Sequence, residues 1–230
     1  MTRINLYMEL SYWLSRWKKG HTGFHMEMGY PGLSAHWPIL PIPQNPVVFI
    51  PLAGKSVDIH WIAEQAQKVV CCEISPIAIE QFFHQFEMDF SISHFASFDI
   101  YHSQNIEFWC GDFMKLPNDK IGELDLIYDK ASLVALPQKM RVPYSNKLAS
   151  FMSDKTKILM HLLSYNQSDM TGPPFSVPPE EVKRLFPDNF ELILLEKNTL
   201  SIHKFEKFLN RGLKSDLIEY LLLLSVVKTI

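Results

Sequence analysis

The sequence has few cysteines and no cysteine motif. Cys71 and Cys72 are adjacent within an apolar run, and Cys110 stands alone in another. Three cysteines cannot build a disulfide framework, and the absence of a CxxC pair argues against a structural zinc site. We therefore expect buried, reduced thiols, as in a cytoplasmic protein.

Long apolar segments and basic clusters are also missing. The longest apolar stretch, 221–227, is far shorter than the ~20 residues that span a bilayer. The N-terminal residues 1–20 are interrupted by charges, unlike a signal peptide. The formal net charge is −3 and the basic residues are scattered, which disfavours a nucleic-acid binder. We expect a soluble monomer of 230 residues with neither membrane nor nucleic-acid partners.

Two common phosphate-binding motifs are absent. Gly54-Lys55-Ser56 resembles the end of a P-loop, but Phe49 stands where the first glycine is required. There is no GxGxxG, which disfavours a nicotinamide-dependent dehydrogenase. None of the nine histidines forms an HExxH or comparable pair, so no metal is expected.

The chain reads as one domain, 1–230, with an N-terminal arm at 1–37 and a main body at 47–230. Prolines at positions 38, 41, 43 and 46 separate the two, because each fixes φ and removes a backbone donor. Within the body, short apolar runs alternate with helix-compatible patterns. Ser75 is a fair N-cap, followed by Pro76 at the first helical position. We expect strands at 47–50, 68–74, 106–110, 124–128, 156–163, 190–196 and 217–227, and helices at 57–67, 76–88 and 179–186.

This alternation predicts an α/β fold with a doubly wound, seven-stranded, mostly parallel, Rossmann-like sheet. The last two strands follow one another without a long helix and are candidates for an antiparallel edge pair. Residues 198–216 have room for a helical segment. Ligands of such sheets lie beyond the carboxyl ends of the strands, so candidate site residues are sought there.

A glycine and a carboxylate follow the first two strands. Gly54 lies at the first strand-to-helix turn and lets a ligand approach the backbone. Glu73 follows 19 residues later, the spacing at which such folds bind the two ribose hydroxyls of a nucleoside. The alternative for Glu73 is a solvated charge at a strand end. The ribose interpretation is favoured, since apolar residues precede Glu73.

The ends of the next two strands carry charge. Asp112 and Phe113 either contact an adenine or serve as a turn or helix cap. Asp129 and Lys130 follow the fourth strand. Lys130 either pairs with a carboxylate for structural reasons or stabilises an anionic acceptor, and the sequence leaves both open.

Two further segments are candidates for a binding site. Trp13 and Trp17 share a helical face of the arm, where they either attach the arm to the body or act as a lid over a cofactor. The long loop 164–175, which ends in Gly172-Pro173-Pro174-Phe175, is either an acceptor pocket wall or a tolerated surface loop.

Several strings together resemble the thiopurine S-methyltransferase family across about residues 10–225. They are 17–25, the Pro51–Ser56 turn, Cys72-Glu73-Ile74-Ser75, 129–133, Leu163-Ser164-Tyr165 and the Gly-Pro-Pro-Phe loop. The resemblance implies a class I methyltransferase that uses S-adenosylmethionine and releases S-adenosylhomocysteine. The cofactor-binding residues it implies are Trp13, Trp17, Phe24, Leu52, Gly54, Glu73, Ile74, Asp112, Phe113, Asp129 and Lys130. The acceptor-binding residues it implies are Phe24, Tyr165, Pro174, Phe175 and Arg211.

The chain departs from the family pattern at two positions. Ala53 replaces a cysteine, and Lys130 stands where the family has arginine. Lysine keeps the charge but loses the bidentate fork, so anion recognition is expected to differ. Which C-terminal basic residue contacts the acceptor is ambiguous, with Arg211 the nearest candidate.

The expected activity is methyl transfer to the sulfur of thiopurines or related small heterocyclic thiols by in-line displacement. Lys130 is the candidate catalytic residue, because a cation there favours the acceptor anion and lowers its pKa. Two alternatives remain. One is methylation of selenium or tellurium compounds, other small thiols or anions, and the other is a cofactor-binding module without catalysis.

Overall fold

The computed structural model describes residues 6–23 and 25–227, and side chains from residue 10. The chain divides into two compact units. The first comprises the chain up to Leu33 together with Gln44–Ile121, and the second comprises Ser34–Pro43 together with the chain from Gly122 onward.

The first unit contains the strand order β3-β4-β5-β2-β1. β1, β2 and β5 are parallel and match three predicted strands. β3 and β4 form an antiparallel hairpin beside β5 that the sequence analysis did not predict, so the expected count of seven strands is wrong. The strands are β1 (Val47–Ile50), β2 (Lys68–Glu73), β3 (Ser91–Phe95), β4 (Phe98–Ser103) and β5 (Ile106–Cys110).

Helices of this unit follow the strands. Ser75 caps α4 as predicted, because its Oγ accepts the Ala78 N–H at 3.4 Å and Pro76 occupies the first turn. α4 buries Ile79, Phe82 and Phe83. α1 packs on α4. The helices are α1 (Leu6–Lys18), α3 (Asp58–Ala63), α4 (Pro76–Gln85), η2 (Phe113–Lys115) and α5 (Asn118–Ile121), and α2 (Pro31–His36) crosses into the second unit.

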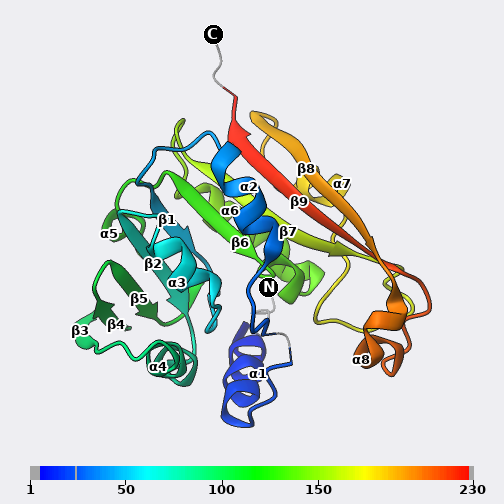
Figure 1. Ribbon diagram of the computed structural model, residues 1–230, viewed down its shortest axis with the longest axis horizontal. Coiled ribbons are helices and arrows are strands. Elements are labelled where there is room, and N and C mark those ends of the chain that lie inside the picture. The colour runs from blue at the N-terminus through cyan, green and yellow to red at the C-terminus, as the bar shows by residue number, and fades with distance from the viewer. Residues whose placement is uncertain (1–5, 24, 228–230) are drawn as a thin grey trace, which may run out of the picture. The chain divides into compact units, whose positions relative to one another are not determined.

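The second unit has the strand order β6-β7-β9-β8, and its long strands run side by side in Figure 1. β6 and β7 are parallel, whereas β9 is antiparallel to both β7 and β8. The predicted antiparallel pair of the last two strands is thus confirmed. The strands are β6 (Leu126–Lys130), β7 (Lys157–Ser164), β8 (Phe190–Leu200) and β9 (Leu217–Val226).

Several boundaries in this unit differ from the prediction, and β8 extends to Leu200 instead of ending at 196. β6 begins two positions later than expected, so Asp129 and Lys130 are its last residues rather than the start of a loop. Pro38 lies within a 3₁₀ turn, η1 (Trp37–Ile39), at the start of the proline segment that was expected only to separate the arm from the body. The reason is that proline is tolerated in a first turn, where its missing N–H has no intrahelical partner.

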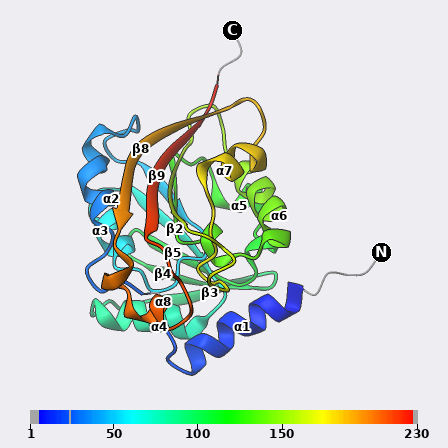
Figure 2. The same ribbon diagram turned by 90° about the vertical axis from the view of Figure 1, so that its right-hand side faces the viewer.

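The remaining helices of the second unit connect its strands. The helical segment allowed for at 198–216 is present as η4 and α8, which lie at the end of the β8–β9 pair in both ribbon views (Figures 1 and 2). α6 was not predicted. The helices are η3 (Leu133–Ala135), α6 (Gln138–Ala149), α7 (Pro179–Leu185), η4 (Ile202–Lys204) and α8 (Glu206–Leu209).

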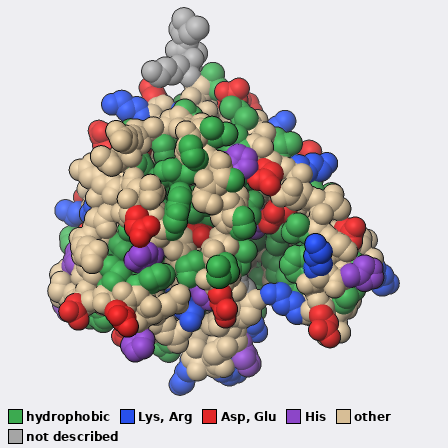
Figure 3. All heavy atoms as spheres, viewed as in Figure 1, with side chains coloured by type: hydrophobic (Ala, Val, Ile, Leu, Met, Phe, Trp, Pro, Cys, Tyr) green, Lys and Arg blue, Asp and Glu red, His purple; other side chains and the backbone are tan. Residues whose placement is uncertain are grey.

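The surface carries charges of both signs. On the face shown in Figure 3, lysine and arginine side chains are dispersed among acidic ones and do not form one continuous basic field. None of the helices in the described part of the chain has the length and apolar character needed to cross a bilayer.

Candidate functional site

The turn after β1 has a left-handed backbone at two of three successive residues. Leu52 has a φ of 45° and Gly54 a φ of 57°. The left-handed region is unfavourable for a residue with a Cβ, so Leu52 is strained. Ala53 between them donates its N–H to the Cys72 carbonyl at 2.9 Å, which ties the turn to the end of β2.

Glu73 joins this turn to the end of β2. Its Oε2 accepts the Gly54 N–H at 2.7 Å, and its Oε1 accepts the Ser75 N–H at 2.9 Å. The residue is 5% exposed. Burial raises the pKa of Glu73, and backbone hydrogen bonds from Ser75, Gly54 and Ile74 oppose that rise. Glu73 is therefore not a solvated charge at a strand end, and its carboxylate faces the turn.

Trp17 of α1 covers the same turn. Its indole is buried, and a Cβ placed on Gly54 would lie 3.3 Å from Trp17 Cζ2. Gly54 is thus required both for its φ and for the close approach of this ring. Trp13, one helical turn earlier, is half-buried and meets the Tyr12 ring edge-to-face. Phe24, the third aromatic candidate of the arm, lies outside the described residues.

Asp112 and Phe113 follow β5, the parallel neighbour of β2. Asp112 Oδ1 accepts the Met114 N–H at 3.0 Å and so caps η2, as in the alternative considered for it. Phe113 is buried and stacks against Phe49 at 6.2 Å. Since β1, β2 and β5 are parallel, the turn, Glu73 and Asp112 all lie at the carboxyl ends of neighbouring strands.

Asp129 is fully buried in the second unit. Its Oδ2 accepts the Tyr144 O–H at 2.8 Å, and its Oδ1 accepts the N–H groups of Ser132 and Leu133 at 3.2 Å each. Burial raises the pKa of Asp129 to about 6 against the effect of these hydrogen bonds. Asp129 thus fixes the backbone that follows β6, where Ala131 has a left-handed φ of 62°.

Lys130 is half-buried at the end of β6. It is the register partner of His161 on β7. Burial raises the pKa of Glu219 on β9, but His161, Asn198 and, last, the charge of Lys130 together lower it. The charge of Lys130 thus acts on a carboxylate of β9 that the sequence analysis did not consider.

Tyr165 and Pro174 of the predicted acceptor loop lie together. The Tyr165 hydroxyl donates to the Pro174 carbonyl at 2.6 Å, and Gln167 Nε2 donates to that hydroxyl at 3.1 Å. Tyr165 is buried beside Met170, and burial raises the pKa of its phenol. The loop is therefore held in a defined conformation and is not a loose surface connection.

Arg211 binds the backbone of the same loop. Its guanidinium donates to the Pro173 carbonyl at 2.9 Å and to the Thr171 carbonyl, and it lies over the Phe208 ring. Both Gly172-Pro173 and Pro173-Pro174 are cis. Arg211 thus links two carbonyl groups of the loop, while its side chain remains largely exposed.

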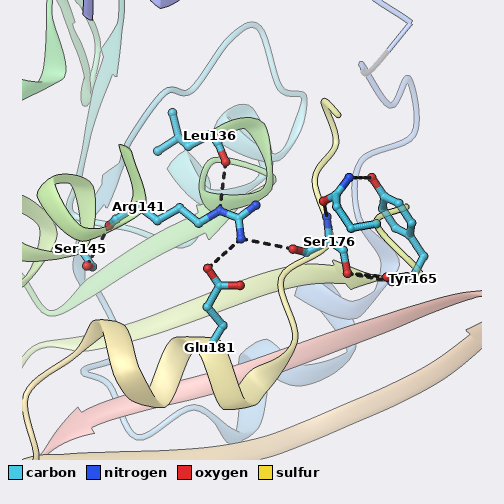
Figure 4. A network of polar contacts seen from close by, with 7 residues as sticks. Leu136, Arg141, Ser145, Tyr165, Ser176 and Glu181 are labelled. Carbon is cyan, nitrogen blue, oxygen red and sulfur yellow. Dashed lines mark hydrogen bonds and ion pairs between the residues drawn. The ribbon is translucent and has the colours of Figure 1, made fainter. Parts of the chain in front are cut away.

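A buried arginine that the sequence analysis did not single out is linked to this loop through Ser176 (Figure 4). Arg141 of α6 is 4% exposed and donates to the carbonyls of Leu136 and Ser176 and to Glu181 Oε1 at 2.7 Å. Ser176 Oγ in turn donates to the Tyr165 carbonyl at 2.7 Å. Arg141 could not be found from the sequence, because Ser176 and Glu181 are distant in the chain and two of its three partners are backbone carbonyls.

The structure thus brings the candidates together in two groups, one in each unit. The first contains Trp17, Leu52, Gly54 and Glu73, with Ile74 half-buried beside them in the chain and Asp112 at the neighbouring strand end. The second contains Tyr165, Pro174 and Arg211, with Phe175 beneath the Arg141 guanidinium at 5.7 Å. Among the residues described, no three of His, Cys, Asp and Glu are placed to hold a metal ion.

The first group fits a nucleoside cofactor. Glu73 accepts a backbone N–H on each oxygen, and lone-pair positions of the carboxylate remain for hydroxyl donors. Gly54 leaves the space that a Cβ would fill. These are the two features that ribose binding requires at this position of an α/β sheet.

Comparison with known sequences agrees with this chemistry. The family model for thiopurine S-methyltransferase matches residues 8–218. A thiopurine S-methyltransferase of Bordetella petrii is 35% identical over 206 residues, which cover 90% of this chain and 94% of the relative.

Solved structures share the fold. A SAM-dependent methyltransferase from Anabaena variabilis superposes with a TM-score of 0.66 at 14% identity, covering 97% of this chain and 96% of its own. A 1,6-didemethyltoxoflavin N1-methyltransferase from Burkholderia thailandensis, bound to 1,6-didemethyltoxoflavin and S-adenosylhomocysteine, gives a TM-score of 0.60 at 13% identity, with 95% and 87% covered. The predicted Rossmann-like class I fold is confirmed. The chain belongs to the thiopurine S-methyltransferase family of S-adenosylmethionine-dependent methyltransferases.

Proposed function

We propose that this protein methylates the sulfur of small heterocyclic thiols of the thiopurine kind. The observation that carries the proposal is the Glu73 carboxylate, held by the Gly54 and Ser75 N–H groups at the turn beneath Trp17. Membership of the family supports the transfer of a methyl group from S-adenosylmethionine. The identity of the acceptor is the part that remains a proposal.

Glu73 and its neighbours bind the cofactor in this account. The two N–H donors orient the carboxylate, so that its remaining lone pairs accept the ribose hydroxyls. Trp17, Leu52, Gly54 and Ile74 contact the nucleoside or its methionine end, together with Trp13, Phe24, Asp112, Phe113, Asp129 and Lys130 as the resemblance implies.

S-adenosylmethionine supplies an electrophilic methyl group on a positively charged sulfur. The protein therefore needs no covalent intermediate and contributes chiefly by alignment, which is worth roughly 7–11 kcal/mol in well-oriented reactions. Burial of Trp17 and Tyr165 excludes water from the groups they cover. The acceptor must lose its thiol proton, and a cation beside its sulfur favours the anion.

Lys130 supplies that cation, and the acceptor loop supplies the shape of the pocket. Lys130 is half-buried, which strengthens its field relative to a lysine in water. Tyr165, Pro174 and Phe175 form the wall, to which the resemblance adds Phe24, and Arg211 fixes the wall by its bonds to Thr171 and Pro173. The protein acts as a cytoplasmic monomer, in keeping with the buried free thiols of Cys71 and Cys72.

Replacing Lys130 tests the acceptor side of the proposal. Lys130→Met is expected to lower kcat/KM for a thiopurine at least tenfold, about 1.4 kcal/mol, which is a larger loss than that in the affinity for S-adenosylmethionine measured by titration calorimetry. The matched control is Lys183→Met, an exposed lysine on α7, which should leave both constants unchanged. Equal kinetics of Lys130→Met and the parent protein would remove Lys130 from the mechanism.

An acceptor screen separates the remaining possibilities. The parent protein is incubated with S-adenosylmethionine and thiopurines, simple thiols, selenite or tellurite, and S-adenosylhomocysteine is measured. Thiopurine turnover supports the proposal. Turnover of selenium or tellurium compounds alone would show that these compounds, and not thiols, are the acceptors. Cofactor binding without turnover of any acceptor would identify a binding module.

A further inference from the structure

Gln167 connects three points of the acceptor loop through one side chain. Its Nε2 donates to the Tyr165 hydroxyl at 3.1 Å and to the Met170 carbonyl at 2.8 Å. Its Oε1 accepts the Ser176 N–H at 2.8 Å. Met170 is 2% exposed and packs in one cluster with Tyr165. An amide at the surface therefore joins the two ends of the loop to a residue that is fixed in the core.

These hydrogen bonds fix the orientation of the Gln167 amide. A backbone N–H can only donate, so the atom that faces Ser176 is the oxygen. The amide nitrogen therefore faces Tyr165 and Met170. The opposite orientation is excluded, because it would place the amide nitrogen against the Ser176 N–H and the amide oxygen against the Met170 carbonyl.

The amide in turn sets the direction of the Tyr165 hydroxyl. Since this hydroxyl accepts a hydrogen bond from Gln167 Nε2, its single proton is left to donate to a carbonyl. The Pro174 carbonyl lies 2.6 Å from the hydroxyl oxygen and the Met170 carbonyl 3.5 Å, so the proton is donated to Pro174. The donors thus follow one order, from Ser176 through Gln167 and Tyr165 to Pro174.

This chain of hydrogen bonds ends at the proposed wall of the acceptor pocket. Pro174 has no N–H, and its carbonyl is bonded to Tyr165. The Phe175 N–H donates to the Val134 carbonyl at 2.6 Å. Because these backbone groups have partners within the protein, the wall holds its shape and needs no water while the Tyr165 proton points to Pro174.

Other contacts keep the loop closed without Gln167. Ser176 Oγ accepts the Tyr165 N–H at 3.0 Å and donates to the Tyr165 carbonyl at 2.7 Å (Figure 4). The Val177 N–H donates to the Leu163 carbonyl at 2.8 Å. The contribution that belongs to Gln167 alone is therefore the direction of the Tyr165 hydroxyl.

We propose that Gln167 is a positioning residue for the methyl acceptor, because it directs the Tyr165 proton to the Pro174 carbonyl. The inference rests on the proposed function, in which Tyr165, Pro174 and Phe175 form the pocket wall. Without the Gln167 donor, the Tyr165 hydroxyl loses its fixed direction and the Pro174 carbonyl loses a permanent donor. The acceptor then packs against a less ordered and more hydrated wall. Gln167 itself does not need to touch the acceptor.

Gln167→Met tests this role, since methionine keeps the length of the side chain and removes its hydrogen bonds. We expect the KM for a thiopurine to rise about tenfold. The change in kcat should be less than about twofold, because the interaction lost is one that binds the acceptor before and during the reaction alike. The Kd for S-adenosylmethionine should not change.

Asn166→Ala is the matched control. Asn166 is the neighbouring exposed residue and also forms three side-chain hydrogen bonds, but all of them stay within the turn formed with Ser168 and Asp169. Its loss should leave the acceptor KM at the value of the parent protein. A similar rise in KM for both variants would show that any disturbance of the loop has this effect.

The coupling between Gln167 and Tyr165 separates positioning from a general effect on the loop. Tyr165→Phe removes the hydroxyl through which Gln167 is proposed to act. The double variant Tyr165→Phe with Gln167→Met should therefore have nearly the KM of Tyr165→Phe alone. If Gln167 only stabilised the loop, the two effects on KM would multiply.

Gln167→Glu provides a second measurement if the methionine variant folds poorly. At neutral pH its carboxylate can only accept hydrogen bonds, so it turns the Tyr165 proton away from Pro174 and should raise KM at least as much. A parent-like KM in either folded variant, or multiplied effects in the double variant, would overturn the inference. Failure of the proposed function has a different signature, since the parent protein would then form no S-methylated product from any thiol.

Discussion

Gly54 combines two constraints that no other residue type satisfies together. Its φ of 57° disfavours any side chain, and the Trp17 ring lies 3.3 Å from the position of a Cβ. Gly122 offers a matched comparison, because its φ of 81° is also left-handed but no atom lies within 4 Å of its Cβ position. The two positions therefore separate backbone strain from contact with Trp17.

We predict that Gly54→Ala and Gly122→Ala both lower the free energy of unfolding by about 1–2 kcal/mol. Only Gly54→Ala should also weaken binding of S-adenosylmethionine, because Trp17 must move away from the turn. Urea unfolding and calorimetric titration measure the two effects. Unchanged cofactor affinity in Gly54→Ala would show that the turn beneath Trp17 does not contact the cofactor.

Asp129 gives a residue-scale prediction about pH. Burial raises its pKa from an ordinary value of 3.8 to about 6. Between about pH 4 and 6 the folded state holds a proton that the unfolded state has released, so the free energy of unfolding falls as pH rises through this window. The loss amounts to at most about 3 kcal/mol.

Asp129→Asn removes this titration. The difference in unfolding free energy between the parent protein and Asp129→Asn should therefore decrease from pH 4 to pH 6 and then level off. Tyr144→Phe should move the upper end of the window to higher pH, because the Tyr144 hydrogen bond lowers the pKa of Asp129. Parallel stability curves for the parent protein and Asp129→Asn would contradict the assignment.

At the residue scale, the spacing of Gly54 and Glu73 was sufficient to predict that they act together, because both follow parallel strands. The role of Asp112 as a cap was also among the alternatives, and the structure confirms it. His161 and Arg141 were missed. Their partners lie 58 and 40 positions away at Glu219 and Glu181, and such pairings depend on strand order that a single sequence does not specify.

At the scale of elements, Arg141 connects α6, α7 and the acceptor loop. Its guanidinium forms an ion pair with Glu181 of α7, and it also holds the Ser176 carbonyl. Removing one partner of such a buried pair leaves an uncompensated charge and typically costs 3–5 kcal/mol, whereas replacing both with apolar residues often costs little.

We predict that Arg141→Met lowers the free energy of unfolding by about 3–5 kcal/mol. The double variant Arg141→Met with Glu181→Met should recover most of that loss, although its acceptor KM should stay raised because Ser176 and Tyr165 lose their support. Urea unfolding and acceptor kinetics measure both. If the double variant is less stable than either single one, the pair is not the reason for the burial of Arg141.

The β3–β4 hairpin shows where sequence patterns failed. All five residues of β3 are exposed, so no alternation of buried and exposed positions was available. The connecting residues Ala96 and Ser97 lack the glycine or asparagine that usually marks a tight hairpin, even though Ala96 has a left-handed φ of 51°. Helix α6 was missed for a different reason, since Pro143 lies inside it.

At the scale of the whole molecule, the fold class was predictable from the sequence, whereas the division of the chain into two compact units was not. Alternating apolar strands and helices indicated a Rossmann-like sheet, and the structural relatives confirm it. The strings that resemble the family lie at strand ends and in one loop, which are the parts of the fold that carry chemistry. The expectation of a single domain, with the arm 1–37 as a lid, stays a prediction.

The most direct test of the central claim is calorimetric titration of the parent protein, Glu73→Gln and Glu73→Ala with S-adenosylmethionine. The account predicts binding by the parent protein and a loss of at least tenfold in affinity for both variants, because a hydrogen bond to a charged group contributes about 1.5–3 kcal/mol. Undiminished affinity in both folded variants would contradict it, since the ribose would then be bound by residues other than Glu73.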